Sequence, residues 1–261
     1  MAEKLTLEKL VDLGKMPTAK VQELAQSSRV YDDFKSEIAC CKALGAGAAT
    51  GTAGDENILI TDNQILRYHV IGTQTIVAPS LHANGLNISQ DLTADDGVEY
   101  APSLVARGKQ VFTVGTDAAF YARCRISIAD VSGTDDLAFG FRKVEAFQAA
   151  IDNYDEMAAL NLISGDIYIE TILNAAATVS TDTTDNVADA AVIDLYVEVS
   201  AAGVVTFKHG LNQSLAAPTT TAAFTFDDGE VVMPFLYLKH DTDVAETTCL
   251  QLWECGLVAE A

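Results

Sequence analysis

Basic residues are scarce in this chain of 261 residues, which holds 16 Lys and Arg against 37 Asp and Glu and has a net charge of −21. Nucleic-acid binding needs clustered basic side chains that displace counterions from phosphates, so the composition argues against a nucleic-acid partner. The same charge disfavours contact with anionic membrane surfaces. All of the acid excess lies in residues 46–261, because residues 1–45 hold seven residues of each sign.

Long hydrophobic runs are also missing. No apolar stretch approaches the roughly 20 residues that span a bilayer, and residues 1–10 have no apolar core of a secretory signal, so we expect synthesis in a cytoplasm. The cysteines number five, and Cys249 and Cys255 lie too far apart on one expected strand for a disulfide, whose Cα atoms approach within about 7 Å. Their spacings do not match metal ligands, which predicts reduced and mostly buried thiols.

Catalytic signatures are absent from the sequence. It contains no Gly-x-Ser-x-Gly elbow, no phosphate-binding loop and no dinucleotide fingerprint. Asp166 and Glu170 share one face of an expected strand, but four residues of strand separate them by roughly 13 Å, whereas a retaining glycosidase needs about 5 Å. His209 precedes Gly210 and predicts a hairpin turn. We therefore expect a protein that is not an enzyme.

The first 45 residues have a helical pattern. Pro17 suits the first turn of a helix and Gly45 suits its end. An apolar stripe at three- and four-residue spacing runs between them and is the expected partner-binding surface: Val21, Leu24, Tyr31 and Ile38. The sequence therefore predicts a short helical N-terminal arm over residues 1–45 and a Gly-rich linker over 46–57. The stripe packs either on its own β-domain or on a partner, and the pattern leaves both open.

The period then changes to two, which predicts strands. The clearest is Phe120–Ile128, and the alternation of Leu137, Phe139 and Phe141 after an acidic turn predicts a hairpin with it. Residues 178–189 read as a Thr- and Asp-rich loop, and 145–160 as either a short helix or a loop with one apolar edge. Further strands are expected at 166–173, 192–199, 204–208, 230–239 and 249–257. The fold class predicted is mainly β, a jelly-roll β-sandwich over residues 105–261 preceded by a β-rich connecting segment over 58–104.

Several stretches resemble the concanavalin-like jelly rolls, the group of legume-lectin and laminin-G type domains. They are Phe120–Ile128, the Ala-Phe-Gly-Phe-Arg of 138–142, the strand 192–199 with the turn that follows it, and a last strand with Trp253. This resemblance covers about residues 105–258 and implies a concanavalin-like sandwich.

The amino-acid sequences of residues 130–136, 154–160 and 218–224 are similar to those of virion proteins of tailed bacteriophages. That resemblance implies a structural role on the particle, and it leaves capsid and tail open. Our first hypothesis is a capsid decoration (cement) protein, made in the host bacterial cytoplasm, that binds the major capsid protein on the virion surface and stabilises the shell. A homo-oligomer is expected, with a trimer suggested by closed symmetry. The alternative hypothesis is a carbohydrate-binding, lectin-like module of a tail fibre or spike that recognises host glycans.

Two kinds of ligand site are worth following. Calcium prefers several oxygen ligands from flexible loops, and three acidic loops offer carboxylates, although none has a full ligand register. The first loop, Asp130, Asp135 and Asp136, is the main candidate; the others hold Asp182, Asp185 and Asp189, and Asp241 and Asp243. A sugar site needs an exposed aromatic ring beside polar groups. Tyr121, Tyr168 and Tyr196 are weighed for this role, but they lie on expected strands, where we expect them to pack within or between the sheets. No other cofactor is expected.

Overall fold

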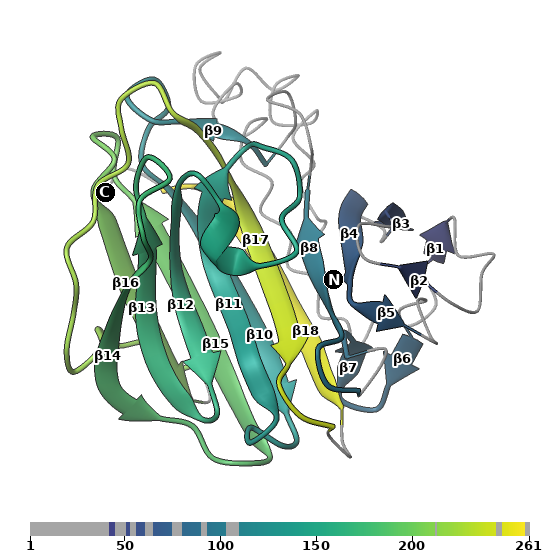
Figure 1. The fold of residues 1–261 in the computed structure, drawn as a ribbon. Coiled ribbons are helices and arrows are strands. Elements are labelled where there is room, and N and C mark those ends of the chain that lie inside the picture. The colour runs from purple at the N-terminus through teal and green to yellow at the C-terminus, as the bar shows by residue number, and fades with distance from the viewer. Residues whose placement is uncertain are drawn as a thin grey trace, which may run out of the picture.

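Two antiparallel β-sheets lie face to face in the computed structural model, which describes residues 42–44, 51–52, 56–60, 65–74, 80–89, 93–102, 110–211, 213–243 and 247–258 (Figure 1). This confirms the predicted mainly β sandwich. A third, two-stranded sheet pairs β2 (Gly51–Thr52) with β5 (Thr73–Gln74). Among the described residues no helix is long and apolar enough to cross a membrane.

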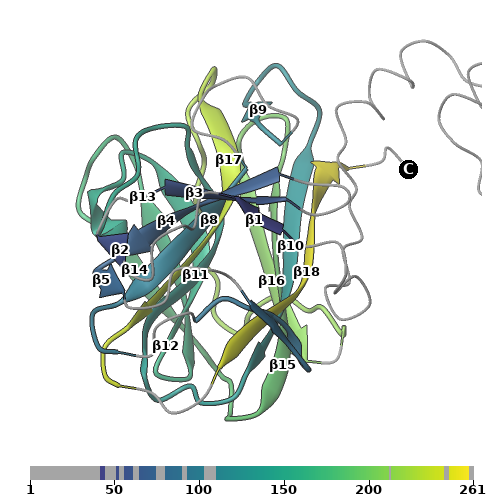
Figure 2. The ribbon, with the colours of Figure 1, turned by 90° about the vertical axis from the view of Figure 1, so that its right-hand side faces the viewer.

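The larger sheet has ten strands, and β9 (Phe112–Thr113) joins it by pairing with β17. In spatial order its other strands are β1 (Lys42–Leu44), β3 (Glu56–Ile60), β4 (Ile65–Ile71), β8 (Gly97–Ala101), β17 (Val231–His240), β11 (Thr134–Lys143), β12 (Met157–Ile163), β13 (Asp166–Ile172) and β14 (Val179–Asn186). Figure 2 shows β3, β4 and β8 lying at a steep angle to β10 and β18 of the other sheet.

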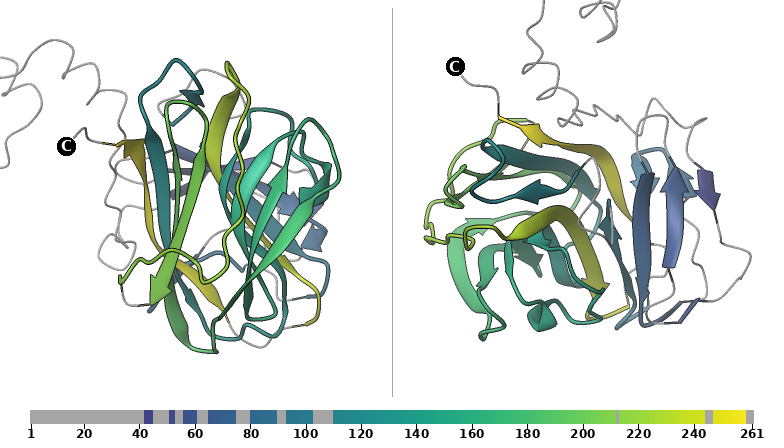
Figure 3. Two further views of the ribbon diagram at one scale, coloured as in Figure 1. Left: turned by 90° about the vertical axis from the view of Figure 1, so that its left-hand side faces the viewer. Right: turned by 90° about the horizontal axis from the view of Figure 1, so that it is seen from above.

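The smaller sheet has six strands. In spatial order they are β16 (Val205–Leu211), β15 (Ala191–Val199), β10 (Phe120–Ile128), β18 (Thr248–Leu257), β7 (Gly85–Asn87) and β6 (Ser80–His82). The view from above in Figure 3 shows the two layers. The turn at Ala201–Gly203 joins β15 and β16 into a hairpin, in agreement with the turn expected after residues 192–199.

The core lies between the sheets and is filled by alternate residues of each strand. Phe120, Ala122, Cys124, Ile126 and Ile128 are all buried there, as the alternation in β10 predicts. Trp253 of β18 meets Phe139 of β11 edge to face, with ring centroids 5.6 Å apart, so the contact joins the two sheets. Cys124, Cys249 and Cys255 are buried, as expected; Cys40 and Cys41 lie outside the described residues.

The predicted hairpin of residues 120–141 is wrong. Strand β10 pairs with β15 and β18, whereas β11 pairs with β12 and β17, so the acidic turn crosses from one sheet to the other. Both strands present an apolar row to the same core from opposite sides, and alternation alone does not distinguish that arrangement from a hairpin.

Two other segments differ from expectation. The predicted Thr- and Asp-rich loop is largely the edge strand β14, because Thr is β-branched and suits a pleated strand. Lys42–Leu44, at the end of the predicted helix, form a strand antiparallel to β3. The ambiguous 145–160 segment is a loop with a single 3₁₀ turn, Ile151–Asn153, followed by β12.

The loop at residues 144–155 lies over the outer face of the larger sheet and covers a charged pair. Arg142 Nη2 donates to Glu99 Oε1 at 2.6 Å, and both side chains are completely buried. The hydroxyl of Tyr154 donates to the other oxygen of Glu99, while the Arg142 guanidinium lies 4.4 Å from the centroid of the Tyr154 ring. Phe147 of the loop stacks on His69 with ring centroids 4.7 Å apart. The loop therefore seals this cluster from solvent.

Candidate functional site

The two sheets end side by side at β14 and β16, where an open edge of the sandwich is bridged by residues 213–226, here named the clasp (Figure 3, left). The clasp pairs with β16 through His209 and Ala216, whose backbone groups exchange hydrogen bonds of 3.0 and 2.9 Å. It reaches β14 through a 3.0 Å bond from Thr220 N to Thr183 O. Both free strand edges therefore have a partner in the clasp, which protects them from pairing with other chains.

Gly210 allows the clasp to approach β16 closely. A Cβ atom built on Gly210 would lie 1.8 Å from the carbonyl oxygen of Ser214, a backbone atom that cannot rotate away. The clasp is also held near this point by Gln213, whose N–H donates to the buried carboxylate of Asp194 at 3.1 Å. The path of the clasp is therefore fixed at two neighbouring points, Gly210 of β16 and Asp194 of β15.

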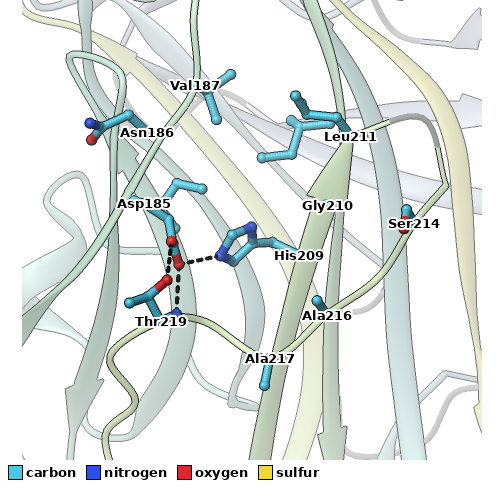
Figure 4. A pocket seen from close by; sticks show the side chains of 12 residues that line it. Asp185, Asn186, Val187, His209, Gly210, Leu211, Ser214, Ala216, Ala217 and Thr219 are labelled. Carbon is cyan, nitrogen blue, oxygen red and sulfur yellow. Dashed lines mark hydrogen bonds and ion pairs between the residues drawn. The ribbon is translucent and has the colours of Figure 1, made fainter.

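A cavity of about 360 Å³ lies between the two strand edges and the clasp (Figure 4). That volume is at the lower end of the range usual for small-molecule sites, roughly 300 to 1,000 Å³. Its lining combines aliphatic side chains with a few polar ones: Ile167, Asp185, Asn186, Val187, Ile193, His209, Gly210, Leu211, Ser214, Ala216, Ala217 and Thr219.

The polar centre of the cavity is the carboxylate of Asp185. It accepts a 2.5 Å hydrogen bond from the Thr219 hydroxyl and a 2.8 Å bond from the Thr219 backbone N–H. His209 Nε2 lies 3.0 Å from Asp185 Oδ2, as the dashed lines in Figure 4 show. The bonds from Thr219 hold the pKa of Asp185 below its usual value, so this carboxylate is ionised at neutral pH. The three residues come from β14, β16 and the clasp, and they join all three walls.

Sequence reasoning named Asp185 only within an acidic loop and placed His209 in a turn. The turn is wrong, because His209 lies within β16 and faces the cavity. The cavity was missed because β14 was predicted as a loop, so no strand edge was expected opposite β16. The signal available for a strand was the series of Thr residues within 179–186. One of them, Thr183, is buried and donates to Ile167 O at 2.6 Å.

The tyrosines weighed for sugar binding are divided between the two sheets. Tyr121 and Tyr196 lie together on the outer face of the smaller sheet, with ring centroids 5.6 Å apart and a tilt of 19°. Their hydroxyls donate to Glu254 at 2.5 Å and to Glu198 at 2.6 Å. Since the two rings stack on each other and both hydroxyls have partners, this pair offers little free ring face. Tyr168 lies on the other sheet, in β13.

Several of the acidic residues considered for calcium have separate protein partners. Asp130 accepts from Ser132 N at 2.9 Å and Ser132 Oγ at 2.6 Å, whereas Asp136 accepts from Asn161 at 2.6 Å. Asp189 accepts from Val131 N, and Asp243 accepts from Ala94 N. In the part of the chain that the structure describes, no three acidic, His or Cys side chains are arranged to hold a metal ion. The calcium site, including Asp135, stays a prediction.

The remaining candidates fall into two groups. Asp166 and Glu170 both lie on β13, but Glu170 is buried and accepts a 2.8 Å bond from Asn161, whereas Asp166 is exposed. The arm residues Val21, Leu24, Tyr31 and Ile38 lie outside the described residues, so their role stays a prediction.

Comparisons with known proteins indicate the fold. No family model and no curated protein matches this sequence. Among solved structures, the exoplasmic/lumenal domain of VIP36 in its Ca²⁺/Man3GlcNAc-bound form has a TM-score of 0.50 at 10% identity, covering 75% of this chain and 85% of that one. This likeness agrees with the concanavalin-like sandwich.

Two further structures match at lower scores. A protein of unknown function from Shewanella oneidensis MR-1 covers 98% of this chain and 95% of its own, at 11% identity and a TM-score of 0.45. The CBM2 module of the evolved Dit of Lactobacillus casei BL23 phage J-1 covers 69% and 78%, at 8% identity and a TM-score of 0.42. At such identities the similarity concerns the fold and not the ligand.

Proposed function

We propose that this chain is a carbohydrate-binding, lectin-like protein and that the cavity beneath the clasp is its sugar site. The observation that carries the proposal is the lining of this cavity. Asp185, His209 and Thr219 form one polar group where the three walls meet, and most of the other lining residues are aliphatic. A sugar ring has the same division between hydroxyl groups and C–H faces, so both of its sides find complementary contacts.

A role as a binding protein is supported by the way the polar groups of the cavity are held in place. Asp185 is held by Thr219, which belongs to the clasp, and by His209, which belongs to β16. A preorganised group of this kind orients a ligand without any change of backbone, which lowers the entropic cost of binding. On a virion, such a domain would serve to recognise host glycans, as the alternative hypothesis from the sequence has it.

Binding is tested by titrating the full chain with neutral monosaccharides and disaccharides while amide signals are followed by NMR. Shifts should concentrate on β14, β16 and the clasp. The substitution Asp185→Ala should weaken the interaction at least tenfold. Asp182→Ala is the matched control, because it removes one exposed carboxylate from the same strand. Equal affinities for the two variants would contradict the assignment of the site.

Capsid decoration remains a second candidate, favoured by the charge division of the chain. An acidic domain attached through a neutral N-terminal segment suits display on a shell, with the major capsid protein as partner and a trimer as the expected assembly. Quantitative mass spectrometry of purified particles separates the two candidates. A copy number comparable with that of the capsid protein supports decoration, whereas a handful of copies supports a tail or spike component.

A further inference from the structure

We propose that the cavity selects an uncharged sugar ring and rejects acidic sugars such as hexuronates. This inference rests on the proposed function and narrows it to one class of ligand. It is carried by the charges that line the cavity and by the hydrogen-bonding role that the geometry leaves to His209.

The charge of the lining has one sign. Of the twelve lining residues Asp185 is the single carboxylate, and none is Lys or Arg. Two exposed carboxylates, Asp182 and Asp189, flank Asp185 in the sequence. A ligand carboxylate in the cavity would therefore meet the carboxylate of Asp185, and the one basic side chain of the lining, His209, is already paired with Asp185. Such repulsion is strongest where water is partly excluded.

The Lys and Arg side chains of the smaller sheet are directed elsewhere. Arg123 and Arg125 both donate to the buried carboxylate of Asp194, at distances from 2.6 to 3.1 Å. Lys208, beside His209 in β16, extends over the ring of Tyr196 at 5.1 Å on the outer face of the sheet. These three cations are bound to the opposite face of the smaller sheet, so they do not offset the charge of Asp185.

The hydrogen bond between His209 and Asp185 fixes which nitrogen of the ring serves a ligand. Because the carboxylate of Asp185 is ionised, it accepts only, and His209 Nε2 must carry the hydrogen in their 3.0 Å bond. In the neutral ring Nδ1 is then an acceptor, and it has no protein partner among the described residues. His209 lines the cavity, so in its neutral form this acceptor can receive a hydrogen bond from a sugar hydroxyl group.

The test compares ligands of matched shape. Glucose, galactose and mannose are titrated in parallel with their uronates and with the corresponding uronamides, and dissociation constants are taken from NMR shifts of the full chain. We expect each neutral hexose that binds to do so at least tenfold more tightly than its uronate. The uronamide, which has the shape of the uronate without its charge, should recover most of the affinity. A uronate that binds as tightly as its hexose overturns the selectivity.

Two variants identify the cause. Asp185→Asn should reduce the preference for the hexose over the uronate to threefold or less, whereas Asp182→Asn on the same strand should leave it unchanged. An unchanged preference in Asp185→Asn overturns the assignment to Asp185. If neither hexoses nor uronates bind the wild-type chain, the proposed function itself is wrong, and this outcome differs from equal binding of both, which overturns the selectivity alone.

Discussion

The molecule has two polar clusters built around a carboxylate, and they differ in their access to solvent. Glu99 lies beneath the loop at residues 144–155, paired with Arg142, and both side chains are completely buried. Asp185 lies at the sandwich edge, where its side chain is 23% exposed and that of His209 is 14% exposed. The first cluster pairs its two charged side chains with each other and serves the fold. The second opens into a cavity and retains a free acceptor, so it can serve a ligand.

The largest expected effect comes from breaking the sealed cluster. Arg142→Ala leaves Glu99 buried without its cation, which should lower the free energy of unfolding by about 3–5 kcal/mol. Denaturant unfolding measures this loss. The double variant Arg142→Met with Glu99→Leu removes both charges and should regain most of the stability. A single variant within about 1 kcal/mol of the wild type would show that the pair contributes little.

A pH effect is expected at the base of the same loop. Glu156 is buried next to Glu230, Asp227 and Asp155, and its burial raises its pKa from 4.5 to about 7. Because the folded state favours the protonated carboxyl, this contribution to stability is complete below pH 4.5 and is lost as the pH rises to 7. The loss is roughly 3 kcal/mol by the usual conversion of pKa shifts.

Unfolding midpoints measured between pH 4 and 8 test this effect. The variant Glu156→Gln should remove most of the decline, while Asp182→Asn, at an exposed position, should retain it. A Glu156→Gln profile that parallels the wild type would show that another group is responsible.

The clasp is tested by Gly210→Ala. The new methyl group would collide with the carbonyl of Ser214, so the clasp must move, at a cost of about 1–3 kcal/mol. Sugar binding should fall with it, because the displaced clasp carries Ser214 and Thr219. Thr206→Ala, at an exposed position of the same strand, is the control. Full sugar affinity in Gly210→Ala would show that the clasp does not shape the site.

The smallest effect on stability is expected at the open cluster. His209→Ala removes a partly exposed pair, so the free energy of unfolding should change by less than about 1 kcal/mol. Sugar affinity should nevertheless fall at least tenfold, because the acceptor is lost. Arg142→Ala should show the opposite combination, a large loss of stability with little effect on sugar affinity, because its site is closed to ligands. A large loss of stability in His209→Ala would remove the distinction between the two clusters.

Some features of this molecule can be predicted from local sequence patterns, whereas others depend on contacts between residues that are distant in the sequence. Alternation located β10 with its correct ends, because one face of Phe120–Ile128 is uniformly apolar. It did not reveal that β10 and β11 belong to different sheets, since strand pairing depends on partners distant in sequence. Strand β14 was missed because its residues are polar: an edge strand needs few apolar side chains, and its Thr residues also suit loops.

The candidate site was beyond the reach of sequence patterns. Asp185 and His209 are 24 residues apart and follow no motif, and they meet because two sheets end at the same edge. Gly210 gave no signal either, because its role depends on the approach of Ser214 in space. The composition shows that the whole excess of acid lies in residues 46–261, but it does not locate a site within them.

The most direct test of the central claim is an NMR titration of the full chain with neutral hexoses at concentrations up to about 20 mM, which detects even millimolar affinities. The account predicts saturable shifts confined to β14, β16 and the clasp, with Asp185 and His209 at their centre. Saturable shifts centred on the outer faces of the sheets, or no shifts at any concentration, would contradict it.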